Sequence, residues 1–285
     1  MSANAGASNA GRNPQGPGQS RERLTHFLAI PLHGQHFTPL PPAYASFKSA
    51  VAQFAIDETP PPDADADADT RIPPGAIRDF NTLHLTLGVM SLPTTEQLQT
   101  ALSTLESLDL RRFLPAAADA TTTDPRLYID LKGVAAMSSA PSRIQKCGVL
   151  MIPPVDSADA TSERLYPFAR AVRDHFVEAG VMQLEARPLK LHATIVNTVY
   201  CKPGKGARDS KRKGGKVRRD DLQFDATDVL ERYRETVFAE RLEVDRVQIC
   251  KMGAKKGVEV VGEDGGVDIV GGGYEVVGSR LIWPP

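Results

Sequence analysis

Two apolar runs, far apart in the chain, each contain a histidine and a threonine separated by a single residue. The runs are NTLHLTLGVMSL at residues 81–92 and LKLHATIVNTVYCK at residues 189–202. In a β-strand, residues i and i+2 point to the same face, so His84 shares a face with Thr86, and His192 shares one with Thr194. The intervening residues are apolar. The pattern therefore predicts two strands, each with one face for the core and one face for chemistry.

The four polar side chains suit phosphodiester chemistry without a metal ion. An imidazole titrates near neutral pH, so one histidine could act as general base and the other as general acid. The threonine hydroxyls could donate hydrogen bonds to non-bridging phosphoryl oxygens. We therefore predict His84 and His192 as catalytic residues, Thr86, Thr194 and Lys190 as phosphate-binding residues, and neither metal nor cofactor. The spacing leaves open which histidine is the base.

Strand context distinguishes these two copies from a third one. The triplet His36-Phe37-Thr38 lies in GQHFTPLPP, where prolines are incompatible with a central strand, so we reject it as a site. We interpret His26 and His175 as structural or surface residues. Trp283 is interpreted as a packing residue rather than a platform for a nucleobase.

The elements around the two runs alternate between helix and strand. The strongest helix patterns lie at 94–108, where Thr94 and Gln97 suit a capping box, and at 162–180, with Gly180 as the C-cap. Further helices are predicted at 42–56 and about 228–238, and further strands at 25–32, 126–137, 145–154, 242–252, 258–261 and 273–283. We predict an α+β fold with two lobes, whose antiparallel sheets face a central groove and carry helices on their outer faces.

The composition excludes several classes of protein. The chain of 285 residues has 34 basic and 35 acidic residues, so it is not a generic nucleic-acid binder. Its three cysteines are widely spaced and form no CxxC pair, which argues against a disulfide framework and a structural zinc site. No run reaches the ~20 apolar residues of a membrane span, and we see no signal peptide. We expect a nuclear or cytoplasmic protein without a membrane partner.

Three polar segments are expected to lie outside the core. Residues 1–22 are predicted to form a disordered tail before a single domain at 23–285. Residues 57–70 form an acidic loop with six acids and no base. Residues 202–219 form a basic loop with nine basic residues and one acid. Three interpretations of the basic loop remain open: RNA capture beside the groove, nuclear import, or a plain solvated loop.

The segments THFLAIPL, TLHLTLGVMSL and LKLHATIVNTVYCK together resemble the two-histidine phosphoesterase superfamily, which includes the LigT-like enzymes. The resemblance is closest to the phosphoesterase domain of the A-kinase anchoring protein and the activating signal cointegrator complex subunit. The His-x-Ser/Thr-apolar motif of that superfamily matches His84 to Leu87 and His192 to Ile195. The resemblance implies a bilobal fold, metal-independent action on 2′,3′-cyclic phosphates or RNA 3′ ends, and catalysis by both histidines.

Three functional hypotheses follow. The first is a phosphodiesterase that acts on RNA ends or cyclic nucleotide phosphates. The second is a non-catalytic module that binds RNA or nucleotides within a transcription-coactivator or RNA-processing complex. The third, ranked last, is a ligase or transferase that runs the same chemistry in reverse. Paired acid and base residues favour the enzyme, because binding alone does not need two imidazoles.

Overall fold

The computed structural model describes residues 23–33, 40–54, 72–115, 124–156, 164–185, 187–201, 223–261, 267–270 and 272–284. The predicted N-terminal tail, the predicted acidic and basic loops, and the rejected triplet at 36–38 lie outside these ranges. Their structure therefore stays a prediction. No helix in the described ranges is both long enough and apolar enough to cross a bilayer.

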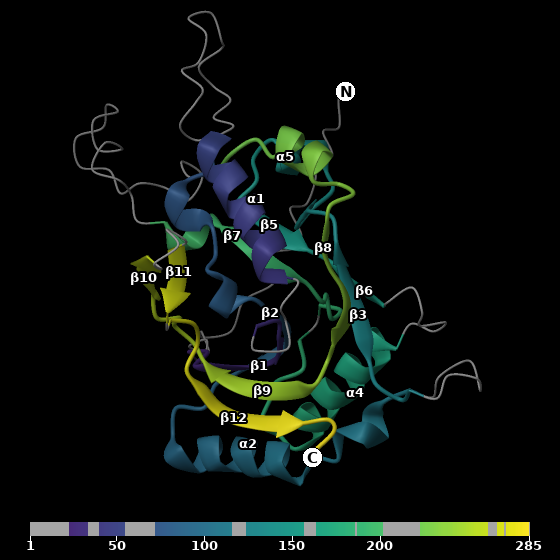
Figure 1. Ribbon diagram of the computed structural model, residues 1–285. Helices are drawn as coiled ribbons and strands as arrows, with labels where there is room; N and C mark the ends of the chain where they lie inside the picture. The colour runs from purple at the N-terminus through teal and green to yellow at the C-terminus, as the bar shows by residue number, and fades with distance from the viewer. Residues whose placement is uncertain are drawn as a thin grey trace, which may run out of the picture.

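Antiparallel sheets form the body of the molecule (Figure 1). The largest has seven strands in the order β12 (Val276–Leu281), β9 (Arg246–Lys251), β1 (His26–Pro31), β2 (His84–Met90), β7 (Ala193–Asn197), β5 (Val149–Ile152) and β4 (Ala135–Ala136). A three-stranded sheet has the order β6 (Pro154–Asp156), β3 (Tyr128–Lys132) and β8 (Val237–Glu243). β10 (Val258–Val261) and β11 (Val267–Val270) form a separate pair.

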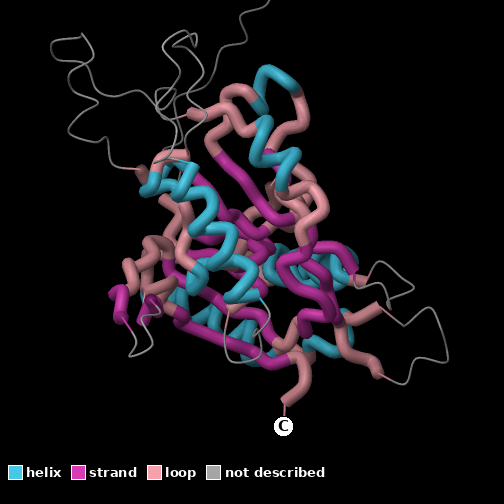
Figure 2. Tube along the Cα trace, turned by 45° about the horizontal axis from the view of Figure 1, so that its top comes forward, coloured by secondary structure: helices cyan, strands magenta, loops and turns pink. Residues whose placement is uncertain are grey.

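Helices pack around these sheets (Figures 1 and 2). The α-helices are α1 (Leu40–Phe54), α2 (Thr95–Ser107), α3 (Pro141–Ile144), α4 (Leu165–Glu178) and α5 (Thr227–Arg232). Short 3-10 helices are η1 (Pro74–Ala76), η2 (Phe80–Thr82), η3 (Leu110–Phe113) and η4 (Thr198–Tyr200). α1 packs on β8, α2 on β12 and α4 on β2. The predicted α+β class with antiparallel sheets is confirmed.

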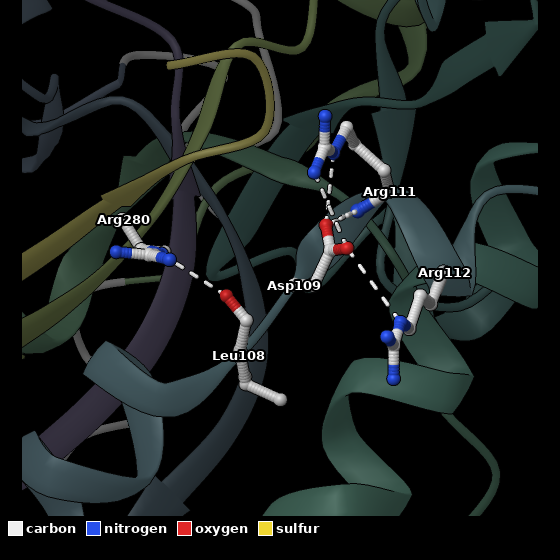
Figure 3. A network of polar contacts seen from close by, with 5 residues as sticks. All are labelled: Leu108, Asp109, Arg111, Arg112 and Arg280. Atoms are coloured by element: carbon white, nitrogen blue, oxygen red, sulfur yellow. Dashed lines mark hydrogen bonds and ion pairs between the residues drawn. The ribbon is translucent and has the colours of Figure 1, made fainter.

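The ends of α2 are fixed by polar contacts. Its capping box forms as predicted, because the Thr94 side chain accepts from the backbone N–H of Gln97 while the Gln97 side chain accepts from that of Thr94. After the helix, the Leu108 carbonyl accepts a hydrogen bond of 3.0 Å from Nε of Arg280 on β12. Figure 3 shows this contact beside the ion pairs of Asp109 with Arg111 and Arg112. The end of α2 is thus joined to the edge strand of the large sheet.

The apolar face of β2 packs against α4 and the segment that follows it. Leu85 and Leu87 are buried on β2, and Phe168, Val172 and Phe176 are buried on α4. Gly180 adopts φ of +72° after the helix, as its predicted role at the C-terminal end requires. This packing leaves the opposite face of β2 available for polar residues.

One predicted helix was too long. Helix α5 ends at Arg232, and residues 237–243, which the sequence assigned partly to that helix, form strand β8 instead. The predicted strand at 242–252 is divided between β8 and β9. Apolar and charged residues alternate irregularly here, and Arg241 has a positive φ of 49°. Pairing with β3, which is distant in sequence, decides the structure of this segment.

Candidate active site

The two motif strands are neighbours in one sheet. From the sequence we expect their polar faces to meet across a groove between two lobes. In the structure β2 pairs directly with β7, antiparallel, with Leu85 opposite Ala193. That register explains how segments about a hundred residues apart bring their polar side chains together.

The register determines which side chains meet. Of the residues described in these two strands, the structure pairs only Leu85 with Ala193, and an antiparallel register continued by one residue in each direction would put His84 next to Thr194 and Thr86 next to His192, on the same face. Opposite pairs in an antiparallel ladder have Cβ atoms about 4.5–5.5 Å apart, and diagonal neighbours are roughly 7–8 Å apart. All four residues are partly exposed, whereas Leu85 and Ala193 between them are fully buried. The predicted division into a core face and a polar face therefore holds in both strands.

Both imidazoles are held in the same way. Nδ1 of His84 lies 2.7 Å from the carbonyl oxygen of Thr82, and Nδ1 of His192 lies 2.7 Å from that of Lys190. A carbonyl can only accept, so each Nδ1 must carry the proton and donate it. The second nitrogen, Nε2, is then unprotonated in the neutral ring and able to accept a proton. Each motif thus orients one imidazole through the carbonyl two residues earlier.

His84 lies in the more enclosed environment. Its ring centroid is 4.7 Å from that of Phe27 and 5.3 Å from that of Tyr274. The pKa of His84 is lowered to about 4, chiefly by burial; the hydrogen bond to Thr82 opposes the shift, and His33, His192 and Arg78 add smaller contributions that lower it. At neutral pH, His84 is a neutral imidazole.

Two further basic residues, His33 and Arg78, lie near His84, and neither was predicted from the sequence. His33 follows β1, and burial and then Arg246 lower the pKa of His33. Arg78 precedes η2, and its backbone N–H bonds the carbonyl of Ile195 on the second motif strand. Neither residue belongs to a motif, and only the non-local pairing of the strands brings them to the site. The positive charge of Arg78 would attract an anion to this face.

Lys190 has a different neighbour from the one expected. Its Nζ donates a hydrogen bond of 3.0 Å to the carbonyl of Met137, and its own carbonyl holds His192. Lys190 therefore positions His192 through its backbone. A role in binding phosphate stays a prediction.

The remaining candidates behave as structural groups. His26 is buried and bonds the hydroxyl of Thr25, and His175 contacts Phe113. Trp283 packs against the core, as interpreted from the sequence. It also lines an open pocket of about 510 Å³ that includes no residue of either motif. Within the described ranges, no three His, Cys, Asp or Glu side chains are grouped so that they could hold a metal ion.

Comparison with known proteins identifies the family. Residues 24–259 match the model described as the AKAP7 2′5′ RNA ligase-like domain. An uncharacterized protein of Schizosaccharomyces pombe is 26% identical over 182 residues, 64% of this chain and 71% of that protein. Escherichia coli LigT in complex with 3′-AMP has a TM-score of 0.41 at 12% identity, covering 91% of this chain and 98% of that one. TT0787 of Thermus thermophilus has a TM-score of 0.40 at 15% identity, covering 90% and 97%. Because the family model spans most of its length, this chain belongs to the AKAP7 2′5′ RNA ligase-like domain family, within the two-histidine phosphoesterase superfamily.

Proposed function

We propose that this protein is a metal-independent phosphodiesterase that acts on 2′,3′-cyclic phosphates or RNA ends, with His84 and His192 as the two residues that transfer protons. Family membership supports a phosphoesterase of this superfamily. The observation that carries the finer proposal is the matched pair of imidazoles on neighbouring strands. Each donates through Nδ1 to a carbonyl and leaves Nε2 for proton transfer.

The environments of the two histidines support a division of labour during hydrolysis. His84 is neutral at pH 7 because burial lowers its pKa to about 4, so its Nε2 can accept a proton from water. The negative charge of a bound phosphate would raise that pKa and make His84 a stronger base. His192 is partly exposed directly before β7, where solvent can reach its ring. We therefore assign the base role to His84 and the acid role to His192.

The proposed step conserves atoms and charge. Water transfers a proton to Nε2 of His84 as its oxygen bonds to phosphorus. The P–O bond to one ribose oxygen breaks, and that oxygen takes a proton from Nε2 of His192. Thr86 and Thr194 donate hydrogen bonds to the non-bridging oxygens, where negative charge must be stabilised. Exchange with solvent then restores both protonation states.

The test is a turnover assay with adenosine 2′,3′-cyclic phosphate and oligonucleotides that end in a cyclic phosphate, in the presence and absence of a chelator. We expect the wild-type protein to open the ring with the chelator present. His84→Asn and His192→Asn should each lower kcat by about 10²–10⁴-fold. Asparagine can keep the donor to the backbone carbonyl, so circular dichroism should remain that of the folded protein. Unchanged turnover in either variant would contradict the proposed roles.

Binding measured in parallel decides the competing hypothesis of a non-catalytic module. Affinity for a nucleotide monophosphate without any product from a cyclic phosphate would select that module. Turnover that the chelator abolishes would instead indicate a metal-dependent reaction.

A further inference from the structure

Three side chains from distant parts of the chain converge beside His84. The guanidinium carbon of Arg78, before η2, lies 4.0 Å from the ring centroid of Tyr200, the last residue of η4. Tyr274, just before β12, lies edge-on to His84 with the ring centroids 5.3 Å apart, and its side chain is close to those of Arg78 and Tyr200. The cluster of Arg78, Tyr200 and Tyr274 therefore adjoins a motif histidine directly.

The backbone holds Arg78 rigidly in this position. Its N–H donates to the carbonyl of Ile195 at 2.8 Å, and its carbonyl accepts from the hydroxyl of Tyr44 at 2.6 Å. Tyr44 is buried on α1 and also reaches the Ile195 carbonyl, at 3.5 Å. The neighbouring residue Ile77 bridges to Val196. Arg78 is thus attached to the strand that presents His192.

The two tyrosines are also fixed by local structure. The side chain of Asn197 caps η4 by accepting from the N–H of Val199, which sets the turn that carries Tyr200. Gly273 precedes Tyr274 with φ of +87°, and a Cβ on it would lie 2.7 Å from the carbonyl oxygen of Asn81. Only glycine permits this close approach, which fixes the start of the segment that carries Tyr274.

Tyr200 keeps a large exposed surface despite its contact with Arg78. Its exposed fraction is 52%, and that of Val199 beside it is 50%. A guanidinium on one side of the ring leaves the other side for a second planar group. Exposed aromatic rings next to positive charge are the features with which proteins stack single-stranded bases, and arginine adds a cation–π contribution.

We propose that Tyr200, backed by Arg78 and positioned by Tyr274, is the platform on which the nucleobase of the substrate stacks. This inference rests on the proposed phosphodiesterase function and narrows it, because it restricts the substrate to nucleotides and single-stranded RNA ends. Tyr274 contacts His84 and lies beside Tyr200, so a nucleoside whose phosphate lies at His84 can bring its base to the exposed ring. Phosphodiesters that lack a base are then poor substrates.

The experiment compares two substrates that differ only in the base. Adenosine 2′,3′-cyclic phosphate carries one, and 1-O-methylribose 2′,3′-cyclic phosphate does not. Tyr200→Ala should raise KM for the adenosine substrate about tenfold, keep kcat within about twofold, and leave the base-free substrate unaffected. Tyr200→Phe keeps the ring and should restore the wild-type KM. Tyr166→Ala is the matched control, because Tyr166 is 41% exposed on α4, which packs on the apolar face of β2.

Each other outcome counts against one proposal in particular. Equal effects of Tyr200→Ala on both substrates, or no effect on either, would overturn the platform while the phosphodiesterase stands. If the wild type turns over neither substrate but binds adenosine 3′-monophosphate, a tenfold weaker affinity in Tyr200→Ala would keep the platform and reject the phosphodiesterase. Unchanged affinity in that variant, or no binding by the wild type, would reject the platform as well.

Discussion

His84 should make the stability of the protein depend on pH between about 6.5 and 4. Its pKa is about 4 in the folded chain and ~6.5 in the unfolded chain. As the pH falls below 6.5, the unfolded chain therefore takes up the proton first, and folding loses stability. The full difference corresponds to about 3.4 kcal/mol at 1.36 kcal/mol for each pH unit. At pH 4.5, where His84 is still partly neutral when folded, the loss is about 2.5 kcal/mol.

The assay is urea denaturation of the wild type and His84→Asn at pH 7.5 and pH 4.5. The other histidines remain in both proteins, so the difference between their two pH effects isolates His84. We expect the wild type to lose about 2.5 kcal/mol more than the variant on going to pH 4.5. Thr86→Val, a non-titrating change on the same face, should follow the wild type. If wild type and His84→Asn lose stability in parallel, His84 is not the enclosed neutral group that its contacts indicate.

Four further outcomes are expected. In the pH profile of kcat/KM, which reports the free enzyme, activity should fall on the acid side only below pH 5, because the pKa of His84 is about 4. A fall centred at pH 6.5 would contradict the role of His84 as base. Gly88→Val should lower the free energy of unfolding by about 1–3 kcal/mol, because a Cβ there overlaps the sulfur of Met182, and Met182→Ala should restore part of the loss in the same denaturation assay. Thr94→Ala should cost about 1 kcal/mol by removing the cap of α2, whereas Thr100→Ala in the middle of the helix should cost less. Tyr44→Phe should cost about 1 kcal/mol and should also weaken substrate binding, because its hydroxyl holds Arg78; wild-type KM in that variant would show that Arg78 needs no such support.

The local elements of the fold could be predicted because their signals are local. The capping box of Thr94 and Gln97 marks the start of α2, and the alternation around His84 and His192 gives each motif strand its two faces. Both signals depend on residues within a few positions of one another. Strand β8 was partly mistaken for a helix because its structure depends on pairing with β3, more than a hundred residues earlier.

Only the site residues that belong to the two motifs could be predicted from the sequence. The histidines and threonines repeat a recognisable triplet, but the pairing of Leu85 with Ala193 joins segments more than a hundred residues apart. Arg78, Tyr200 and Tyr274 lie in three separate segments without a shared pattern, so nothing in the sequence indicates that they meet. The strand alternation also could not predict where the side chain of Lys190 points. Its Nζ donates to the carbonyl of Met137, a residue that is distant in the sequence.

Within the described residues, the ladder between β2 and β7 consists of a single residue pair, Leu85 with Ala193. Around it, the hydroxyl of Tyr44 on α1 and the backbone of Ile77 and Arg78, in the segment that leads to β2, contact Ile195 and Val196 of β7. His84 lies on β2 and His192 directly before β7, so turnover requires that these two strands remain paired. Low urea concentrations should therefore abolish activity while the far-ultraviolet circular dichroism signal of the helices persists. A bound nucleotide should shift the loss of activity to higher urea concentrations, because it stabilises the paired state of the two strands.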